Sequence, residues 1–293
     1  MPLISSRTRG DLLILLAAFI WGIAFYFQKV AMLQIGPLLF LGMRGAVAAL
    51  VLLPFMLREQ RRTVRVEAAA GGGIWRLGLM AGGVFFLAGS TQQSGIVSAT
   101  VTNTGFLTAL YVVVTPFLFW IVRRQRPGLW TWLSVALAFA GVWALSGGSL
   151  GALNKGDILV ACSSLFWASL LIISGEASRH AQPLTYTCIQ FSVVAIVSLA
   201  CAFVFENVAI DALLRALIPI LYVGVLSSAL TFGLMAIALQ HVPAPRASIL
   251  LSMETVFAAS AGFFFLGERL SGSGVFGALL ILSAVLVVQR SRD

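Results

Sequence analysis

The stretch GDLLILLAAFIW at residues 10–21 returns as GDILVACSSLFW at residues 156–167, and this repeat decides the fold. The same shift of 146 residues carries Pro37 onto Pro183. Each copy begins with Gly-Asp before an apolar run. This pattern predicts a helix start, because an aspartate there accepts hydrogen bonds from the free backbone N–H groups. The chain is therefore predicted to consist of two related halves, residues 1–150 and 151–293.

The composition predicts that the solvent of this chain is lipid. Its 293 residues are 60% hydrophobic and 10% charged, with a mean hydropathy of +1.01, whereas soluble domains carry about 25% charged residues. The net charge of +9 does not indicate nucleic-acid binding, because the arginines lie in short loops between apolar runs. The first apolar run exceeds the roughly 7–15 residues of a signal peptide and lacks a small-residue cleavage site, so we expect it to be retained.

Ten apolar segments are long enough to cross a bilayer, which takes about 20 residues each. They cover residues 11–32, 37–57, 74–94, 98–122, 128–146, 157–175, 183–205, 215–239, 246–266 and 271–288. Each half holds five, an odd number, so the second half must enter the membrane from the opposite side. The prediction is an all-α integral membrane protein of ten transmembrane helices in two inverted five-helix repeats.

The distribution of cationic residues predicts the orientation. With the N-terminus in the cytoplasm, the cytoplasmic segments would hold 14 of the 19 Lys and Arg residues. These are Arg7, Arg9, Arg58, Arg61, Arg62, Arg65, Arg76, Arg123, Arg124, Arg126, Arg179, Arg246, Arg290 and Arg292. The outer loops would hold only Lys155, Arg215 and Arg269. Because cytoplasmic loops carry an excess of Lys and Arg, both termini are predicted to be cytoplasmic.

Three stretches resemble a known family: WGIAFYFQK at residues 21–29, GFLTALYVVVTP at 105–116 and LGERLSG at 266–272. They are similar to the ten-helix drug/metabolite transporter superfamily, EamA type, and within it to the YddG-type exporters of aromatic amino acids. The resemblance implies alternating-access export in the inner membrane. Many members have Glu-Pro in the ninth span, where this chain reads SMETVFAAS at residues 252–260, so a proline kink is not expected there.

Two tryptophans lie at an unusual depth. Trp21 and Trp167 each follow a helix-starting aspartate by ten residues, which places them about 15 Å into the membrane at 1.5 Å per residue, although tryptophan prefers the interface. Either both pack between helices, or they form an aromatic pair lining a central cavity. Phe85, Phe86 and Tyr111 fall at a similar depth.

Four charged residues are candidates for a substrate site or a gate. Lys29 lies near the outer surface, where it would snorkel to the headgroups, act as an outer gate, or pair with Glu268. An arginine inside a membrane needs a partner or a wet cavity, so Arg44 would pair with Glu268 or Glu254, or bind a substrate carboxylate. Glu254 has three open roles: a fixed ion pair, a contact to a substrate ammonium group, or carriage of a coupling proton.

The predicted function is that of an inner-membrane secondary transporter, exporting small metabolites by alternating access around an aromatic-lined cavity. Neutral and aromatic amino acids are the leading substrates. The alternatives are a sugar-phosphate or drug transporter of the same superfamily, or a lipid scramblase. An enzyme is not expected, because no catalytic motif appears. No metal or other cofactor is expected, since His180 and His241 lie in loops. The partners would be a small-molecule substrate and the bilayer, and a monomer suffices.

Overall fold

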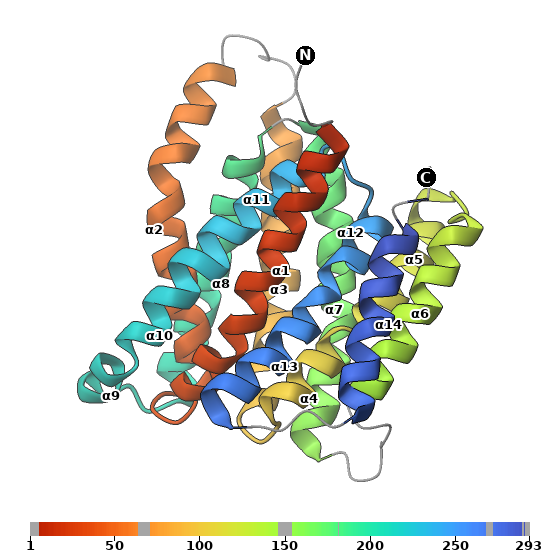
Figure 1. Cartoon of the computed structure of the whole chain (residues 1–293). Coiled ribbons are helices and arrows are strands. Elements are labelled where there is room, and N and C mark those ends of the chain that lie inside the picture. The colour runs from red at the N-terminus through yellow and green to blue at the C-terminus, as the bar shows by residue number, and fades with distance from the viewer. Residues whose placement is uncertain are drawn as a thin grey trace.

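The computed structural model describes residues 6–63, 71–145, 154–180, 182–267, 272–288 and 290, and these residues are almost entirely helical (Figure 1). In the first half the helices are α1 (Ser6–Ala31), α2 (Pro37–Thr63), α3 (Gly71–Ile96), α4 (Val101–Thr108), α5 (Tyr111–Arg123) and α6 (Leu129–Leu145). In the second half they are α7 (Lys155–Ala177), η1 (Ser178–His180), α8 (Pro183–Phe205), α9 (Ile210–Arg215), α10 (Leu217–Leu221), η2 (Tyr222–Leu230), α11 (Thr231–Ala238), α12 (Ala244–Leu251), α13 (Met253–Leu266) and α14 (Gly272–Val288).

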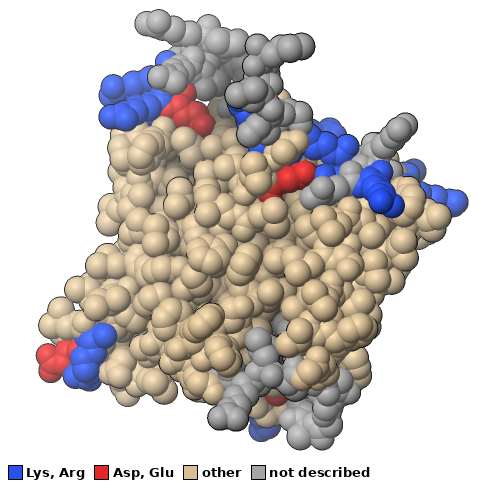
Figure 2. Space-filling model, in the orientation of Figure 1, with Lys and Arg blue, Asp and Glu red and all other residues tan. Residues whose placement is uncertain are grey.

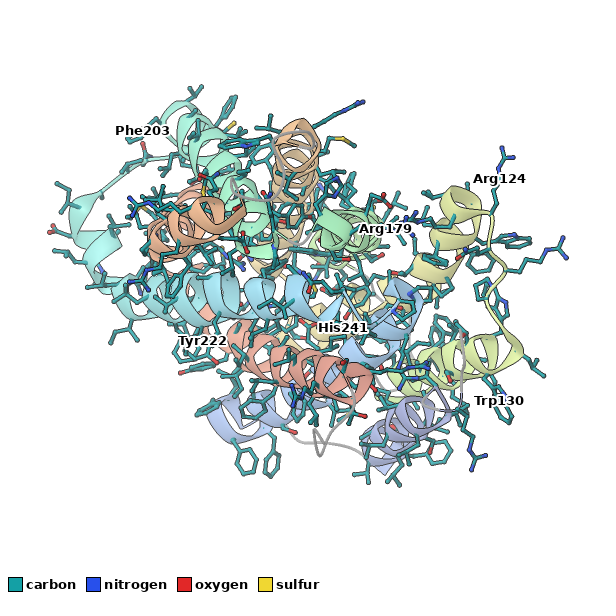
Figure 3. The ribbon with its side chains drawn as sticks, turned by 90° about the horizontal axis from the view of Figure 1, so that it is seen from above. Arg124, Trp130, Arg179, Phe203, Tyr222 and His241 are labelled. Atoms are coloured by element: carbon teal, nitrogen blue, oxygen red, sulfur yellow. The ribbon has the colours of Figure 1, made fainter. Side chains whose placement is uncertain are left out.

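The helices have the length and surface of an integral membrane protein. In the part of the chain that the structure describes, eight helical segments are long and apolar enough to cross a bilayer, and Leu129–Ala144 and Gly272–Val288 are shorter apolar helices. Figure 2 shows Lys and Arg gathered mainly at the end of the bundle where α1 begins, with an uncharged flank between the two ends. Seen from above, Phe203 and Trp130 point outward on different sides of the bundle, where lipid would surround them (Figure 3). Lipid contact accounts for the many large apolar side chains that are exposed.

The closest helix pairs each join the two halves. Helix α2 packs along α8, α6 along α14, and α3 along both α7 and α8. The α6–α14 pair forms one side of the molecule (Figure 1). Small residues allow this contact: a Cβ added to Gly141 would lie 2.7 Å from the backbone oxygen of Gly277. Small side chains let membrane helices approach closely, which replaces the hydrophobic driving force that lipid does not provide.

Helices α2 and α8 cap each other: a glutamate at or near the C-terminal end of each helix binds the N-terminus of the other. The carboxylate of Glu206, just after α8, accepts hydrogen bonds from the backbone N–H groups of Leu38 and Leu39 in α2, both at 2.8 Å. At the other end Glu59 of α2 accepts from the N–H groups of Leu184 and Thr185 in α8, at 3.3 and 2.6 Å. A carboxylate at a helix N-terminus satisfies free donors and complements the helix dipole. The two helices are therefore held against sliding at both of their ends.

Two of the predicted spans are broken helices rather than continuous ones. The span predicted at 98–122 is divided into α4 and α5 at Ala109 and Leu110, and the span predicted at 246–266 is divided into α12 and α13 at Ser252. The second break occurs without a proline. The hydroxyl of Ser252 donates to the Ile249 carbonyl at 2.5 Å, and that of Thr255 donates to the Ser252 carbonyl at 2.7 Å. Such back-bonding by Ser and Thr bends helices.

The two Gly-Asp repeats differ in structure, and one expectation is corrected. Asp157 does start a helix, because it forms a capping box with Asn154 at the beginning of α7. Asp11 does not, since α1 already begins at Ser6 and Asp11 lies buried inside it. Its carboxylate instead pairs with Arg246, 2.7 Å from Nη2 to Oδ2. Arg246 was expected at the cytoplasmic start of the span 246–266; it is buried in α12, where it also donates to the Val288 carbonyl at 2.7 Å.

Candidate functional site

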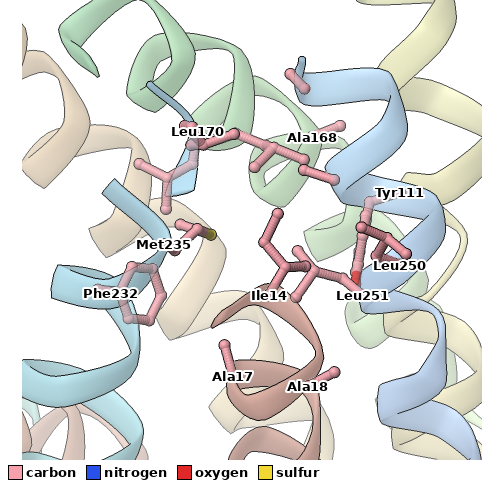
Figure 4. Packing of buried hydrophobic residues seen from close by; sticks show 14 of the residues in the cluster. Ile14, Ala17, Ala18, Tyr111, Ala168, Leu170, Phe232, Met235, Leu250 and Leu251 are labelled. Carbon is pink, nitrogen blue, oxygen red and sulfur yellow. The ribbon is translucent and has the colours of Figure 1, made fainter. Parts of the chain in front are cut away.

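A cavity lies between the two halves. It is lined by Trp21, Phe25, Gln28, Arg44, Gln92, Thr108, Tyr111, Trp167, Leu170, Leu171, Ser227, Phe232, Met235, Leu251 and Glu254. These residues come from helices of both halves. Figure 4 shows part of the lining, with Phe232, Met235 and Leu170 on one side and Tyr111 and Leu251 on the other. Ligand pockets are mostly apolar and aromatic with a few polar groups, and the lining of this cavity has that character.

Aromatic rings form one wall of the cavity, and both Trp21 and Trp167 belong to its lining. Phe232 of α11 is its centre, with its ring 4.8 Å from Trp21, 5.2 Å from Phe85 and 6.4 Å from Trp167. Phe85 is completely buried behind the wall, with its ring 5.0 Å from that of Trp167. Phe86, by contrast, is only half-buried and lies outside the cavity lining.

The sequence interpretation missed Phe232, although a signal was present. The shift of 146 residues relates Phe232 to Phe86. The repeat therefore related the predicted site residue Phe86 to Phe232, and of these two equivalent positions it is Phe232 that lines the cavity. Neutral polar side chains form another part of the lining. Gln92 donates to the Thr108 hydroxyl at 2.8 Å, and Gln93 donates to Gln28. Gln28, Gln92 and Thr108 form a polar edge of the cavity.

Arg44 reaches the cavity from α2 without an acidic partner among the residues that the structure describes. Its Nε donates to the Ser228 hydroxyl at 3.0 Å. Its guanidinium carbon lies 5.6 Å from the centre of the Phe85 ring, within the range of a cation–π contact. Arg44 is only 3% exposed, so these two contacts fix a buried cation at the edge of the cavity.

Glu254 brings a carboxyl group to the same cavity from another element, α13. Its carboxylate accepts a long hydrogen bond from the Tyr111 hydroxyl, at 3.5 Å. The structure does not bring Glu254 and Arg44 into an ion pair, although both line the same cavity. The predicted pairing of these two residues is therefore not observed. The other acidic partner considered for Arg44, Glu268, lies outside the described residues.

Lys29 has a different setting from the ones expected. Its Nζ donates to the carbonyls of Ile96, Val97 and Ala99, at 2.8, 3.1 and 2.8 Å. These carbonyls lie at and just beyond the C-terminal end of α3, where backbone acceptors have no partner within the helix. Lys29 therefore ties α1 to the end of α3. A pairing with Glu268 falls outside the described residues, and a gating role stays a prediction.

The two cavity tryptophans use their indole N–H groups differently, which leads to a matched prediction. Trp21 donates to the Ser227 carbonyl at 2.7 Å, whereas the Nε1 of Trp167 is buried without a partner among the described residues. Both changes to Phe remove a similar volume, but only Trp21→Phe removes a hydrogen bond, worth about 1 kcal/mol. We expect Trp21→Phe to lower the melting temperature in detergent more than Trp167→Phe. An equal or larger loss for Trp167→Phe would contradict this assignment.

Comparisons with known proteins agree with the membrane architecture. The model of the EamA-like transporter family matches the chain twice, over residues 8–147 and 154–290. The fold is similar to that of a solved crystal structure, with a TM-score of 0.75 and 15% sequence identity. The alignment covers 95% of this chain and 96% of the chain in that structure. At that identity the likeness shows the fold alone.

Relatives of known sequence are transporters by name. An uncharacterized transporter of Archaeoglobus fulgidus is 30% identical over 282 residues, which cover 96% of this chain and 86% of the relative. The threonine/homoserine exporter RhtA of Salmonella typhimurium is 31% identical over 256 residues, covering 83% of this chain and 78% of the relative. The family expected from residues 21–29, 105–116 and 266–272 is thus confirmed, and the names indicate a transporter rather than an enzyme.

Proposed function

Because the chain belongs to the EamA-like transporter family, we propose that it exports neutral amino acids, aromatic ones included, across the cell inner membrane. Transport proceeds by alternating access: the two halves rock around the cavity and open it to one side at a time. The substrate binds in the cavity between Arg44 and Glu254.

The observation that carries this proposal is the presence of a guanidinium and a carboxyl group in one cavity. An amino acid presents a carboxylate and an ammonium group on the same carbon atom. Arg44 has guanidinium N–H groups not used by Ser228, and such groups bind a carboxylate with two parallel hydrogen bonds. Glu254 accepts from an ammonium group. The two residues line the same cavity without neutralising each other, so a zwitterion satisfies both.

The remaining lining favours neutral side chains. Trp21, Trp167 and Phe232 offer apolar faces, and Gln28, Gln92 and Thr108 offer neutral hydrogen-bonding groups. This combination suits apolar, aromatic or hydroxylated side chains better than charged ones. RhtA, which is named an exporter of threonine and homoserine, and the resemblance to YddG-type exporters both support this substrate class. Sugar phosphates fit less well, because Arg44 is the one cationic residue in the described lining.

We also propose ten membrane-spanning segments in two inverted repeats, residues 1–150 and 151–293. The reciprocal caps support this arrangement. Glu59 of the first half caps the N-terminus of α8, and Glu206 of the second half caps the N-terminus of α2. The broken segments α4–α5 and α12–α13 fall in corresponding positions of the two halves. The double match of the family model is compatible with it as well.

Counterflow in proteoliposomes tests the substrate. Vesicles loaded with an unlabelled amino acid are diluted into the same labelled compound, and protein-free liposomes serve as the control. We expect transient accumulation of labelled threonine, homoserine, phenylalanine or tryptophan, and little of glutamate, lysine or glucose 6-phosphate. Accumulation of glucose 6-phosphate alone, or of none of the amino acids, would refute the proposed function.

Labelling of single cysteines tests the orientation, with both termini in the cytoplasm. Starting from a variant without Cys162, Cys188 and Cys201, Lys155→Cys marks the start of α7 and Arg58→Cys the end of α2, and both residues are exposed. A thiol reagent that does not cross membranes is expected to label Lys155→Cys but not Arg58→Cys in intact cells, and both after lysis. The reverse pattern in intact cells would overturn the proposed orientation.

A further inference from the structure

The helix that carries Ser227 and Ser228 is not an α-helix. Residues Tyr222–Leu230 form the π-helix η2, in the middle of the segment Leu217–Ala238. In a π-helix each N–H group bonds to the carbonyl five residues earlier, which makes room for an extra residue, and such segments frequently occur at functional sites. A nine-residue π-helix beside the cavity is therefore a feature that needs a physical role.

Two consecutive residues of η2 hold two cavity residues of the first half. The backbone carbonyl of Ser227 accepts from Trp21 Nε1 at 2.7 Å and also from the Thr231 hydroxyl at 2.6 Å. The hydroxyl of Ser228, which is completely buried, accepts from Arg44 Nε at 3.0 Å. Trp21 lies on α1 and Arg44 on α2, so η2 links both helices to the wall of the cavity.

A glycine lets η2 come close enough to α2 for this contact. A Cβ added to Gly224 would lie 2.7 Å from the Cβ of Val47 and 3.3 Å from the backbone oxygen of Arg44. Any larger residue would push η2 away from the turn of α2 that carries Arg44. The approach of the two backbones thus brings the Ser228 hydroxyl within reach of the guanidinium.

The other half of the molecule offers an internal comparison. The shift of 146 residues relates Trp21 to Trp167, Arg44 to Gln190, and Ser227–Ser228 to Ala81–Gly82. Residues 81 and 82 lie in the regular α-helix α3, where position 82 has no hydroxyl. Within the described ranges, Trp167 Nε1 and both amide atoms of Gln190 are buried without a partner. The π-helix and its two serines therefore bind Trp21 and Arg44, and no equivalent contact holds Trp167 and Gln190 within the described residues.

We propose that Ser228 is a positioning residue, which aims the guanidinium of Arg44 at the carboxylate of the substrate. This inference rests on the proposed function. Ser228 takes the Nε hydrogen on one side, and the face of Phe85 takes the cation on the other. The two terminal nitrogens, which form the edge best matched to a carboxylate, are left for the ligand. Ser228 itself does not line the cavity.

The test compares substrates with and without a carboxylate. Counterflow of labelled phenylalanine and threonine is measured in the presence of an unlabelled competitor. The competitor is either the amino acid itself or its amide, in which a neutral carboxamide replaces the carboxylate. In the unchanged protein the acid is expected to compete better than the amide. For Ser228→Ala we expect the apparent KM of the acid to rise about tenfold, the effect of losing one hydrogen bond to a charged group, while competition by the amide changes little.

Three further variants complete the design. Ser228→Thr keeps the hydroxyl and is expected to restore the preference for the acid, whereas the near-isosteric Ser228→Cys, a weak acceptor, is expected to lose it without leaving a void. Ser163→Ala is the matched control, because Ser163 is equally buried but its hydroxyl bonds to the Val160 carbonyl of its own helix. The shift in melting temperature caused by phenylalanine or its amide, measured against each variant alone, gives a readout independent of transport.

The outcomes separate this inference from the proposed function. Arg44→Gln is expected to abolish the preference for the acid over the amide. If Arg44→Gln abolishes it and Ser228→Ala and Ser228→Cys keep it, Ser228 does not position Arg44, and the proposed function stands. If Arg44→Gln itself keeps the preference, the carboxylate contact is wrong and both proposals fall. An equal loss for Ser163→Ala would show that the effect is a general one of buried serines.

Discussion

Glu254→Gln is expected to lower counterflow of a neutral amino acid about ten- to a hundredfold, the range for losing a hydrogen bond between charged groups. The amide of Gln keeps the size of the side chain and can still interact with Tyr111, but it loses the negative charge that faces the cavity. Because the proposed partner is the substrate's ammonium group, exchange and transport driven by a pH gradient should weaken together.

Analogues without an ammonium group provide the control for Glu254. Phenyllactate has the carboxylate and ring of phenylalanine, with a hydroxyl in place of the ammonium. Its competition should be weak in the unchanged protein and no weaker in Glu254→Gln. Surviving counterflow with loss of pH-driven transport would instead assign Glu254 to proton coupling. A stable Gln variant that is fully active in both assays would leave Glu254 without any of its predicted roles.

Asp11→Asn is expected to lower the free energy of unfolding by about 3–5 kcal/mol, because it leaves a buried arginine without its counter-ion. Arg246 binds Asp11 through two nitrogens, at 3.0 and 2.7 Å, and the two side chains are only 6% and 12% exposed. The pair joins α1 of the first half to α12 of the second. The measurement is unfolding of the purified protein in detergent.

The exposed pair Arg123–Glu176 is the matched control for the buried one. Its side chains are 23% and 40% exposed, and Glu176→Gln should cost less than about 1 kcal/mol, as is typical of exposed ion pairs. The double variant Asp11→Leu, Arg246→Met should recover part of the stability lost in Asp11→Asn, since it removes both buried charges. The expected role of the pair is contradicted if Asp11→Asn costs no more than Glu176→Gln.

Residue type and count predicted much of the cavity lining. Trp21, Trp167 and Tyr111 were expected at mid-depth because they follow the membrane entry by a known number of residues, and all three line the cavity. Arg44 and Glu254 were singled out because charge is costly in lipid, and they line it too. What these residues do for a substrate stays a prediction.

Partners were less predictable than positions. Arg44 binds Ser228 across 184 residues of chain and Asp11 binds Arg246 across 235, and no local pattern encodes which distant side chain completes a buried charge. The copies of the Gly-Asp motif show the same limit. Asp157 caps α7 because Asn154 precedes it, whereas Asp11 lies inside a helix that begins five residues earlier.

The sequence by itself determined the membrane, the family and the succession of apolar segments, because lipid requires about 20 apolar residues for each crossing wherever the partners lie. Only the tertiary structure decided that the segment Leu217–Ala238 contains a π-helix and that Glu206 caps α2 while Glu59 caps α8. It also decided that Arg44 and Glu254 line one cavity without forming an ion pair. These features depend on how closely and in which register distant helices pack. That register is set by the small residues and hydrogen bonds between the two halves, which no apolar pattern along one helix contains.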